Sequence, residues 1–140
     1  GEPLLNGKVH RGMVKGARFI MDTYGLRRIV ATLPEDYTVR LGGHSLGAGT
    51  VALLLAMLKA DPKLRHRNVS GFGFGMPACM EPQLALSLRD SLTAVIHRED
   101  IVPRLSFTNL VRLREHFNNP EEKAWCKQQL EEDYQCLWKY

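Results

Sequence analysis

The longest uncharged stretch of the chain covers residues 41–58, and it constrains the fold more than any other segment. It begins with glycines, ends in an almost wholly apolar run, and directly follows the alternating apolar and polar residues of 37–41. Such alternation predicts a half-buried strand, and a helix that is apolar all round is buried. These patterns predict a strand at 37–41, a tight turn at 42–45 and a buried helix at 46–59.

The rest of the chain alternates between helical and extended patterns. The predicted elements are a helix from about residue 12 to 33 that kinks after Gly25, strands at 68–74 and 92–97, and a helix at 81–90. Strands separated by helices predict an α/β fold with a mostly parallel sheet. Near the C-terminus, Asn119-Pro120-Glu121-Glu122 is typical of a helix start. An apolar stripe at helical spacing follows it, made of Cys126, Leu130, Tyr134, Leu137 and Trp138.

Length and composition are those of an ordinary globular domain. The chain has 140 residues, 44% hydrophobic and 24% charged, which excludes disordered and collagen-like proteins. Its net charge is +4, and no stripe of basic and aromatic residues predicts nucleic-acid binding. The sequence shows no signal-peptide pattern and no run of about 20 apolar residues. We expect a cytoplasmic protein, or one that associates with membranes through parts outside this chain.

The three cysteines predict neither a zinc knuckle nor a redox motif, because no C-x-x-C pair is present. If Cys126 and Cys136 share one helix, about 15 Å separate them along its axis. A disulfide needs Cα atoms within about 7 Å, so these two residues would not pair within a straight helix. We therefore expect reduced thiols.

The segment Gly43-His44-Ser45-Leu46-Gly47 matches G-x-S-x-G and lies between the first predicted strand and the buried helix. A nucleophile elbow requires this context, because a sharp strand-to-helix turn exposes the serine hydroxyl. Small residues on either side keep strand and helix from clashing. The Leu46 N–H would then point toward a developing oxyanion. The alternative is an ordinary glycine-rich turn with a capping serine.

A serine nucleophile needs a base, and the base needs an acid that orients it. Asp100 follows the strand predicted at 92–97, and the carboxyl end of a strand is where such an acid belongs. Glu99 is one residue away and should face elsewhere, so it ranks second. The alternative is that Asp100 is only a turn or helix-cap acid.

Three blocks of the sequence resemble the class 3 lipases, which are α/β-hydrolases. They are Val9-His10-x-Gly12, residues 43–49 around Ser45, and 100–105 from Asp100 onward. The continuation through 110 is similar to the sn-1-specific diacylglycerol lipases, and the resemblance covers roughly 7–113. It implies a partial α/β-hydrolase core over 1–113 and a helical extension over 114–140, where an insertion would start. It also implies that Ser45 is the nucleophile, Asp100 the triad acid and a glycerolipid ester the substrate, with no metal or cofactor.

The resemblance also assigns supporting roles. His44 is a family hallmark that packs on the sheet and is not the base, while Gly43, Gly47 and His10 support the elbow. The family's first oxyanion donor lies upstream of the Val9-His10 block, and its triad histidine lies downstream of the acid. His116 is the one histidine after Asp100, and it would serve as base only if a helix folded it back over Ser45.

Two histidines remain. His97 ends a predicted strand, and His66 lies in the basic run 63–67, which reads as a solvated loop or as a contact for anionic lipid head groups. The leading expectation is a serine hydrolase of acylglycerols that contacts membrane surfaces peripherally. The alternatives are a catalytically incomplete hydrolase that binds lipid or a partner, and another acyl chemistry such as phospholipase A or acyl transfer.

Overall fold

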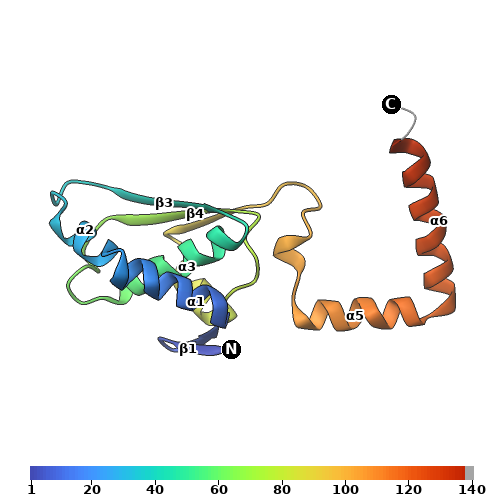
Figure 1. The fold of residues 1–140 in the computed structure, drawn as a ribbon, viewed down its shortest axis with the longest axis horizontal. Helices are drawn as coiled ribbons and strands as arrows, with labels where there is room; N and C mark the ends of the chain where they lie inside the picture. Colours follow the sequence, from blue (N-terminus) through green and yellow to red (C-terminus); the bar gives the residue numbers. More distant parts are fainter. Residues whose placement is uncertain (138–140) are drawn as a thin grey trace. The chain divides into compact units, whose positions relative to one another are not determined.

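The computed structural model describes residues 1–137, without the side chains of 107 and 133–137 (Figure 1). The chain packs into two compact units, Gly1–Arg104 and Leu105–Tyr140. The division after residue 104 reflects packing alone. The end of the hydrolase core expected at residue 113 therefore stays a prediction. Among the described residues, no helix combines the length and apolar character that crossing a membrane would require.

The first unit contains both β-sheets. Its elements are β1 (Glu2–Leu4), β2 (Gly7–Val9), α1 (Arg11–Arg18), the π-helix η1 (Phe19–Thr23), α2 (Leu26–Thr32), β3 (Val39–His44), α3 (Leu46–Ala60), β4 (Val69–Phe74), α4 (Pro82–Ser87), β5 (Leu92–Val95) and the 3₁₀ turn η2 (Val102–Arg104). The second unit consists of α5 (Phe107–Asn118) and α6 (Pro120–Leu137).

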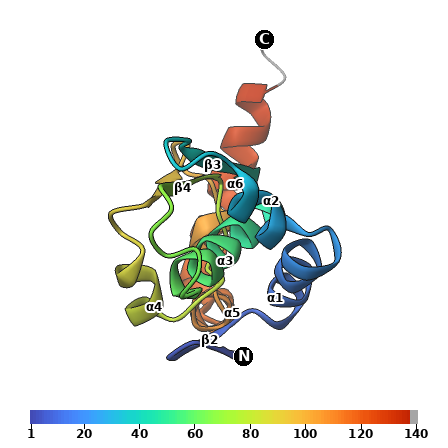
Figure 2. The ribbon, with the colours of Figure 1, turned by 90° about the vertical axis from the view of Figure 1, so that its left-hand side faces the viewer.

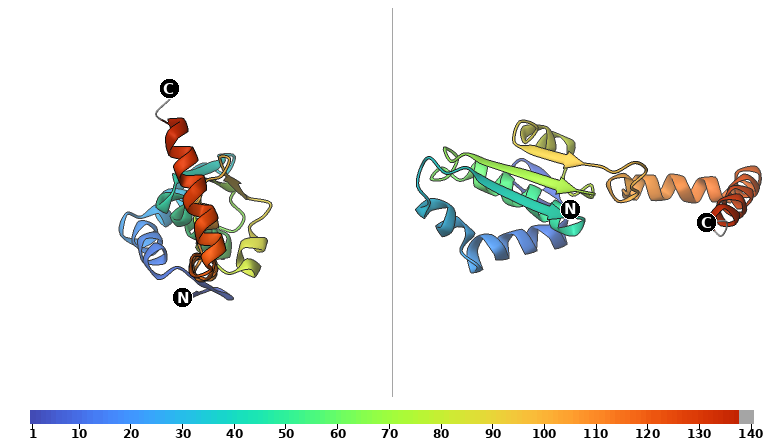
Figure 3. Two further views of the ribbon diagram at one scale, coloured as in Figure 1. Left: turned by 90° about the vertical axis from the view of Figure 1, so that its right-hand side faces the viewer. Right: turned by 90° about the horizontal axis from the view of Figure 1, so that it is seen from above.

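The main sheet has the strand order β3-β4-β5, and both pairs are parallel. Seen from above in Figure 3 (right), the three strands lie side by side. The helix α3 connects β3 to β4, and α4 lies between β4 and β5 along the chain. This is the alternation expected of an α/β fold, and the predicted parallel sheet is confirmed.

The helices α1, α3 and α4 lie on one side of this sheet, with α3 directly under β3 and β4 (Figure 2). The central helix was expected to be buried all round, and nine of its residues are buried. Its fully buried leucines pack with side chains from α1, η1 and α2. The largest fully buried side chains of this core are Leu53, Leu55, Leu58, Val14, Met21 and Val30. Burying a Leu or Val side chain is worth about 1.5–3 kcal/mol, so the core stabilises α3 and the sheet that α3 packs against.

Several boundaries differ from the predicted ones. The strand β3 continues through the expected turn, because Gly42, Gly43 and His44 pair in register with 72–74 of β4. The turn therefore shrinks to Ser45 alone. The expected kink after Gly25 is a full break between η1 and α2, with Gly25 at a φ of +73°.

The N-terminal region and some later elements also differ from the predictions. An antiparallel hairpin joins β1 and β2 through Leu5 at a φ of +52°, and no strand was expected there. The helix α4 and the strand β5 are shorter than the expected segments 81–90 and 92–97. The helix expected from Asn119 is confirmed, since Asn119 Oδ1 accepts from the Glu121 N–H at 3.0 Å. Of its stripe, the side chains of Tyr134, Leu137 and Trp138 lie outside the described residues.

The basic run 63–67 is only partly solvated. Lys63, Arg65 and His66 are exposed, but Arg67 is 5% exposed and its guanidinium donates to the carbonyls of Leu33 and Pro34 at 2.8 and 2.7 Å. Those carbonyls lie just after α2, at its C-cap Leu33 and the following residue, where no helical hydrogen bond satisfies them. Reading Arg67 as part of a solvated loop was wrong, because it pairs with these distant carbonyls.

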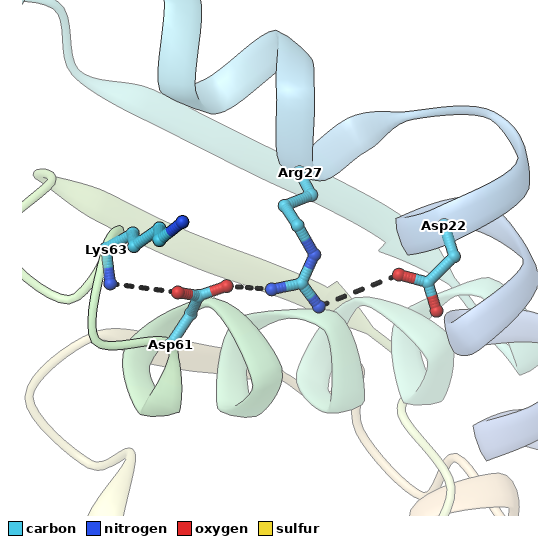
Figure 4. A network of polar contacts seen from close by, with 4 residues as sticks. All are labelled: Asp22, Arg27, Asp61 and Lys63. Atoms are coloured by element: carbon cyan, nitrogen blue, oxygen red, sulfur yellow. Dashed lines mark hydrogen bonds and ion pairs between the residues drawn. The ribbon is translucent and has the colours of Figure 1, made fainter.

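A polar network ties the C-terminal end of α3 to the preceding helices (Figure 4). The Asp61 carboxylate accepts from the Lys63 N–H at 2.9 Å and from the Arg27 guanidinium, which also lies 3.6 Å from an oxygen of Asp22. The Asp61 side chain is only 8% exposed, so its pairing matters more than that of Asp22 at 64%. This network holds the end of α3 that is remote from Ser45.

Candidate active site

Ser45 has a strained backbone, with φ +52° and ψ −120°. It links the last residue of β3 to the first residue of α3. Its N–H donates to the Phe74 carbonyl at 2.9 Å, and its carbonyl accepts from Ala48 and Gly49 at 3.0 and 3.3 Å. A non-glycine residue at such angles costs of order 1–3 kcal/mol and persists only where the surroundings impose it. Here the paired strand and the buried helix impose it.

The glycine two residues before Ser45 is required by sterics. A Cβ on Gly43 would lie 2.5 Å from the carbonyl carbon and oxygen of Gly47 and 2.8 Å from the Ala48 nitrogen. All three are backbone atoms that cannot move without breaking the elbow. Gly47 differs, since a Cβ there would meet nothing within 4 Å in this structure. The expected need for a small residue therefore holds at Gly43 but not at Gly47 within the described chain.

Leu46 begins α3, so its N–H is one of the helix donors without an intrahelical acceptor. The helix dipole adds partial positive charge at the same point. A cavity of about 470 Å³ opens beside Leu46 and is mostly apolar, lined by Ile20, Leu26, Leu41, Val51 and Leu54 among others. This arrangement offers an N–H donor to an anion and an apolar space next to it.

Asp100 lies in an exposed loop after β5 that is closed by hydrogen bonds. Its N–H donates to the His97 carbonyl, and its Oδ1 accepts from the Val102 N–H, each at 3.0 Å. The Arg104 guanidinium donates to the Asp100 carbonyl and, at 3.1 Å, to that of Arg98. The loop therefore uses one carboxylate oxygen for its own turn and leaves Oδ2 directed elsewhere.

The second carboxylate oxygen of Asp100 approaches the end of β4. Its Oδ2 lies 2.7 Å from the position that a Cβ on Gly75 would take, and His44 Nε2 lies 3.9 Å from the same point. The Gly75 N–H donates to the Val95 carbonyl at 3.0 Å. Asp100 Oδ2 and His44 Nε2 thus lie near the same point at the carboxyl ends of the strands, and His44 directly precedes Ser45. No role for Gly75 was expected from the sequence, although its place just after a strand was a usable signal.

His44 is an exposed residue at the end of β3. The exposure of β3 alternates along the strand, with Gly43 turned toward α3 and His44 exposed. The expected packing of His44 on the sheet stays a prediction, since its side chain lies on the opposite face from Gly43.

The other ionisable candidates, His10, His116 and Glu99, each have their own surroundings. His10 caps α1, since its Nδ1 accepts from the Met13 N–H at 3.3 Å, and its own N–H donates to the Cys79 carbonyl at 2.8 Å. His116, in the second unit, contacts the Glu122 carboxylate through Nδ1. Glu99 is exposed beside the half-buried Asp100.

The two cysteines that the structure describes in full are free thiols, Cys79 and Cys126. Cys79 is buried, and its Sγ lies 3.8 Å from the Gly49 carbonyl in the helix that follows the elbow. Burial raises the pKa of the Cys79 thiol from 9.0 to about 11. It is therefore an inert, protonated side chain in the core, with no nucleophilic role.

Comparisons with known proteins agree with this geometry. The family model "Lipase (class 3)" matches residues 2–110. Diacylglycerol lipase-beta of Mus musculus is 33% identical over 109 residues, which are 75% of this chain and 16% of that protein. Lipase II from Rhizopus niveus superposes with a TM-score of 0.58 at 27% identity, over 74% of this chain and 41% of its own.

A further solved structure shows the fold alone, at 22% identity. It is a triacylglycerol lipase described as having a serine protease triad as its catalytic centre, with a TM-score of 0.63 over 79% of this chain and 43% of that one. The chain thus spans less than half of each of these proteins, and the expected resemblance is confirmed. Because the family model matches most of its residues, the chain belongs to the class 3 lipase family.

Proposed function

We propose that this chain forms part of a serine hydrolase that cleaves glycerolipid esters, with Ser45 as the nucleophile. One observation carries the proposal: Ser45 has a strained backbone at the N-terminus of a buried helix, in a chain of the class 3 lipase family. A strained serine at this point exposes its hydroxyl and places N–H donors beside it. The diacylglycerol lipase among its relatives supports an acylglycerol substrate.

The proposed chemistry follows from the positions of three groups. The Ser45 hydroxyl attacks the ester carbonyl, and the Leu46 N–H stabilises the oxyanion, an interaction worth about 3–4 kcal/mol in related sites. A histidine of the full-length protein takes the serine proton and passes it to the leaving alcohol, and Asp100 orients that histidine. Water then cleaves the acyl-enzyme and regenerates Ser45.

The cavity beside Leu46 supports a lipid substrate. Its mostly apolar lining, which includes Leu46 and Gly47 of the elbow, would hold an acyl chain near the attacking residue. Leu46 is 62% exposed, and Phe74 and Ile101 near the same strand ends are also exposed. We propose that these side chains contact the lipid surface from which the substrate is drawn, which would make the protein a peripheral membrane partner.

The test is labelling of the full-length protein with a fluorophosphonate probe, alongside hydrolysis of a diacylglycerol. Ser45→Ala should abolish both, and Asp100→Asn should lower turnover by about 10⁴-fold with folding retained. Ser70→Ala, which changes a serine of β4 away from the elbow, is the matched control and should behave as the parent. Equal labelling of Ser45→Ala and parent would contradict the proposal. Absence of labelling in a folded parent would instead favour a hydrolase that has lost its chemistry.

A further inference from the structure

Gly75 leaves a space that the Asp100 carboxylate fills. Its φ is +55°, and a Cβ built on it would lie 2.7 Å from Asp100 Oδ2, far inside van der Waals contact. The next nearest atoms to that Cβ position are the Asp100 carboxyl carbon at 3.8 Å and His44 Nε2 at 3.9 Å. The collision is therefore with the acid itself and not with the surrounding backbone.

Asp100 cannot relieve this collision by a simple rotation. Its Oδ1 accepts from the Val102 N–H at 3.0 Å, so turning the carboxylate breaks that bond. Its backbone is held by the His97 carbonyl and by the Arg104 guanidinium. A side chain at position 75 would therefore displace the carboxylate, the whole loop, or both.

Gly75 itself has a fixed position relative to the elbow. Its N–H donates to the Val95 carbonyl of β5, and the carbonyl of its neighbour Phe74 accepts from the Ser45 N–H. The Phe74 carbonyl and the Gly75 N–H belong to one peptide unit, so Gly75 is bonded directly to the group that holds Ser45. The position of Asp100 relative to Gly75 therefore sets its position relative to the elbow.

We infer that Gly75 is a positioning residue: its missing side chain sets how closely the Asp100 carboxylate approaches the elbow. The inference rests on the proposed function, in which Asp100 orients the catalytic histidine. A carboxylate beside a histidine stabilises its protonated form. Moving Asp100 away should therefore lower both the rate of the chemical step and the pKa of that histidine.

The test compares Gly75→Ala with Gly25→Ala in the full-length protein. Both glycines have positive φ, but a Cβ on Gly25 would meet nothing within 4 Å, so that variant carries the backbone cost without the collision. We expect Gly75→Ala to lower kcat about 100-fold with KM changed less than 3-fold, and to shift the acidic limb of the pH–rate profile to lower pH. Gly25→Ala should change neither kcat nor the acidic limb of the pH–rate profile.

A double-mutant cycle separates this inference from the proposed function. In an Asp100→Ala background, Gly75→Ala should have little further effect on kcat, and its effect on the thermal midpoint should shrink to that of Gly25→Ala. The thermal midpoint can be measured without activity. It therefore tests for the collision between a side chain at position 75 and Asp100 even if Ser45 is not a nucleophile. Equal effects of Gly75→Ala on kcat and thermal midpoint in both backgrounds would overturn the inference.

Discussion

Ser45 and Asp100 are held in place by different kinds of contact. Ser45 lies between a strand paired along its length and a helix with nine buried residues, so the fold's core imposes its backbone. Asp100 lies in a loop whose residues are mostly exposed, where hydrogen bonds from Val102 and Arg104 and one to the His97 carbonyl set its position. The nucleophile is therefore placed by tertiary packing and the acid by local bonds, and the two should fail in different ways.

The largest effect is expected at the elbow. Gly43→Ala places a Cβ against backbone atoms of the first turn of α3, so we expect a loss of about 3 kcal/mol in unfolding free energy along with loss of activity. Urea unfolding measures it. Gly42→Ala is the matched control, because a Cβ on the neighbouring glycine of β3 meets nothing within 4 Å. Similar stabilities of the two variants would break the distinction between core-imposed and loop-imposed positions.

A substitution in the loop that holds Asp100 should lower kcat more than it lowers the free energy of unfolding. Arg104→Met removes the guanidinium that donates to the carbonyls of Arg98 and Asp100. We expect kcat to fall about 10-fold while the unfolding free energy changes by roughly 1 kcal/mol or less, because the bonds are exposed and local. Steady-state kinetics and urea unfolding of one preparation give both values. A stability loss as large as that of Gly43→Ala would show that the loop is part of the core.

Substitutions at the C-terminal end of α3 test whether the stability of this helix and the geometry of the elbow are independent. Asp61→Ala removes the acceptor of the Lys63 N–H and the Arg27 guanidinium, and we expect a loss of about 1 kcal/mol with unchanged labelling of Ser45. Asp22→Ala, which removes the exposed partner of Arg27 at 3.6 Å, should leave stability nearly unchanged. If Asp61→Ala slowed labelling, the strain at Ser45 would depend on the whole length of α3.

The smallest effect concerns the buried thiol beneath the elbow helix. The folded Cys79 keeps its proton to about pH 11, whereas an unfolded cysteine loses it near pH 9. The unfolded state therefore binds fewer protons between these values, and stability should fall with rising pH in that window, by on the order of 1 kcal/mol by pH 10. Urea unfolding between pH 7 and 10.5 should show this slope in the parent and in Cys126→Ala. The slope should be reduced in Cys79→Ala, and an unchanged slope would mean that other groups produce it.

Local patterns predicted the elbow well, because its signals lie in one continuous segment. The alternation before Ser45, the spacing of Gly43 and Gly47, and the apolar run after them fixed the order strand, turn and helix. The extent of the turn was wrong, since Gly42 and His44 join β3 only through pairing with β4. Strand pairing is a long-range contact, and no local pattern reports it.

The acid side could be predicted only in outline. The position of Asp100 after a strand was visible in the sequence, but the approach of its Oδ2 to Gly75, which lies before α4 and β5 in the chain, was not. Arg67 was misread for the same reason, because its acceptors at Leu33 and Pro34 lie more than thirty residues away. The type of a residue shows that its side chain is basic or small, but it does not show which distant atom that side chain contacts.

The sequence by itself determined the parallel α/β pattern, the elbow around Ser45 and the resemblance to the class 3 lipases. The elbow depends on turn sterics within a few consecutive residues, the α/β pattern on hydrophobic periodicity within each segment, and the resemblance on three short blocks. Only the tertiary structure decided that Gly43 is sterically required where Gly47 is not, that His44 is exposed, and that Asp100 fills the space left by Gly75. Those outcomes depend on how closely separate strands and loops approach, which is set by packing of the whole unit.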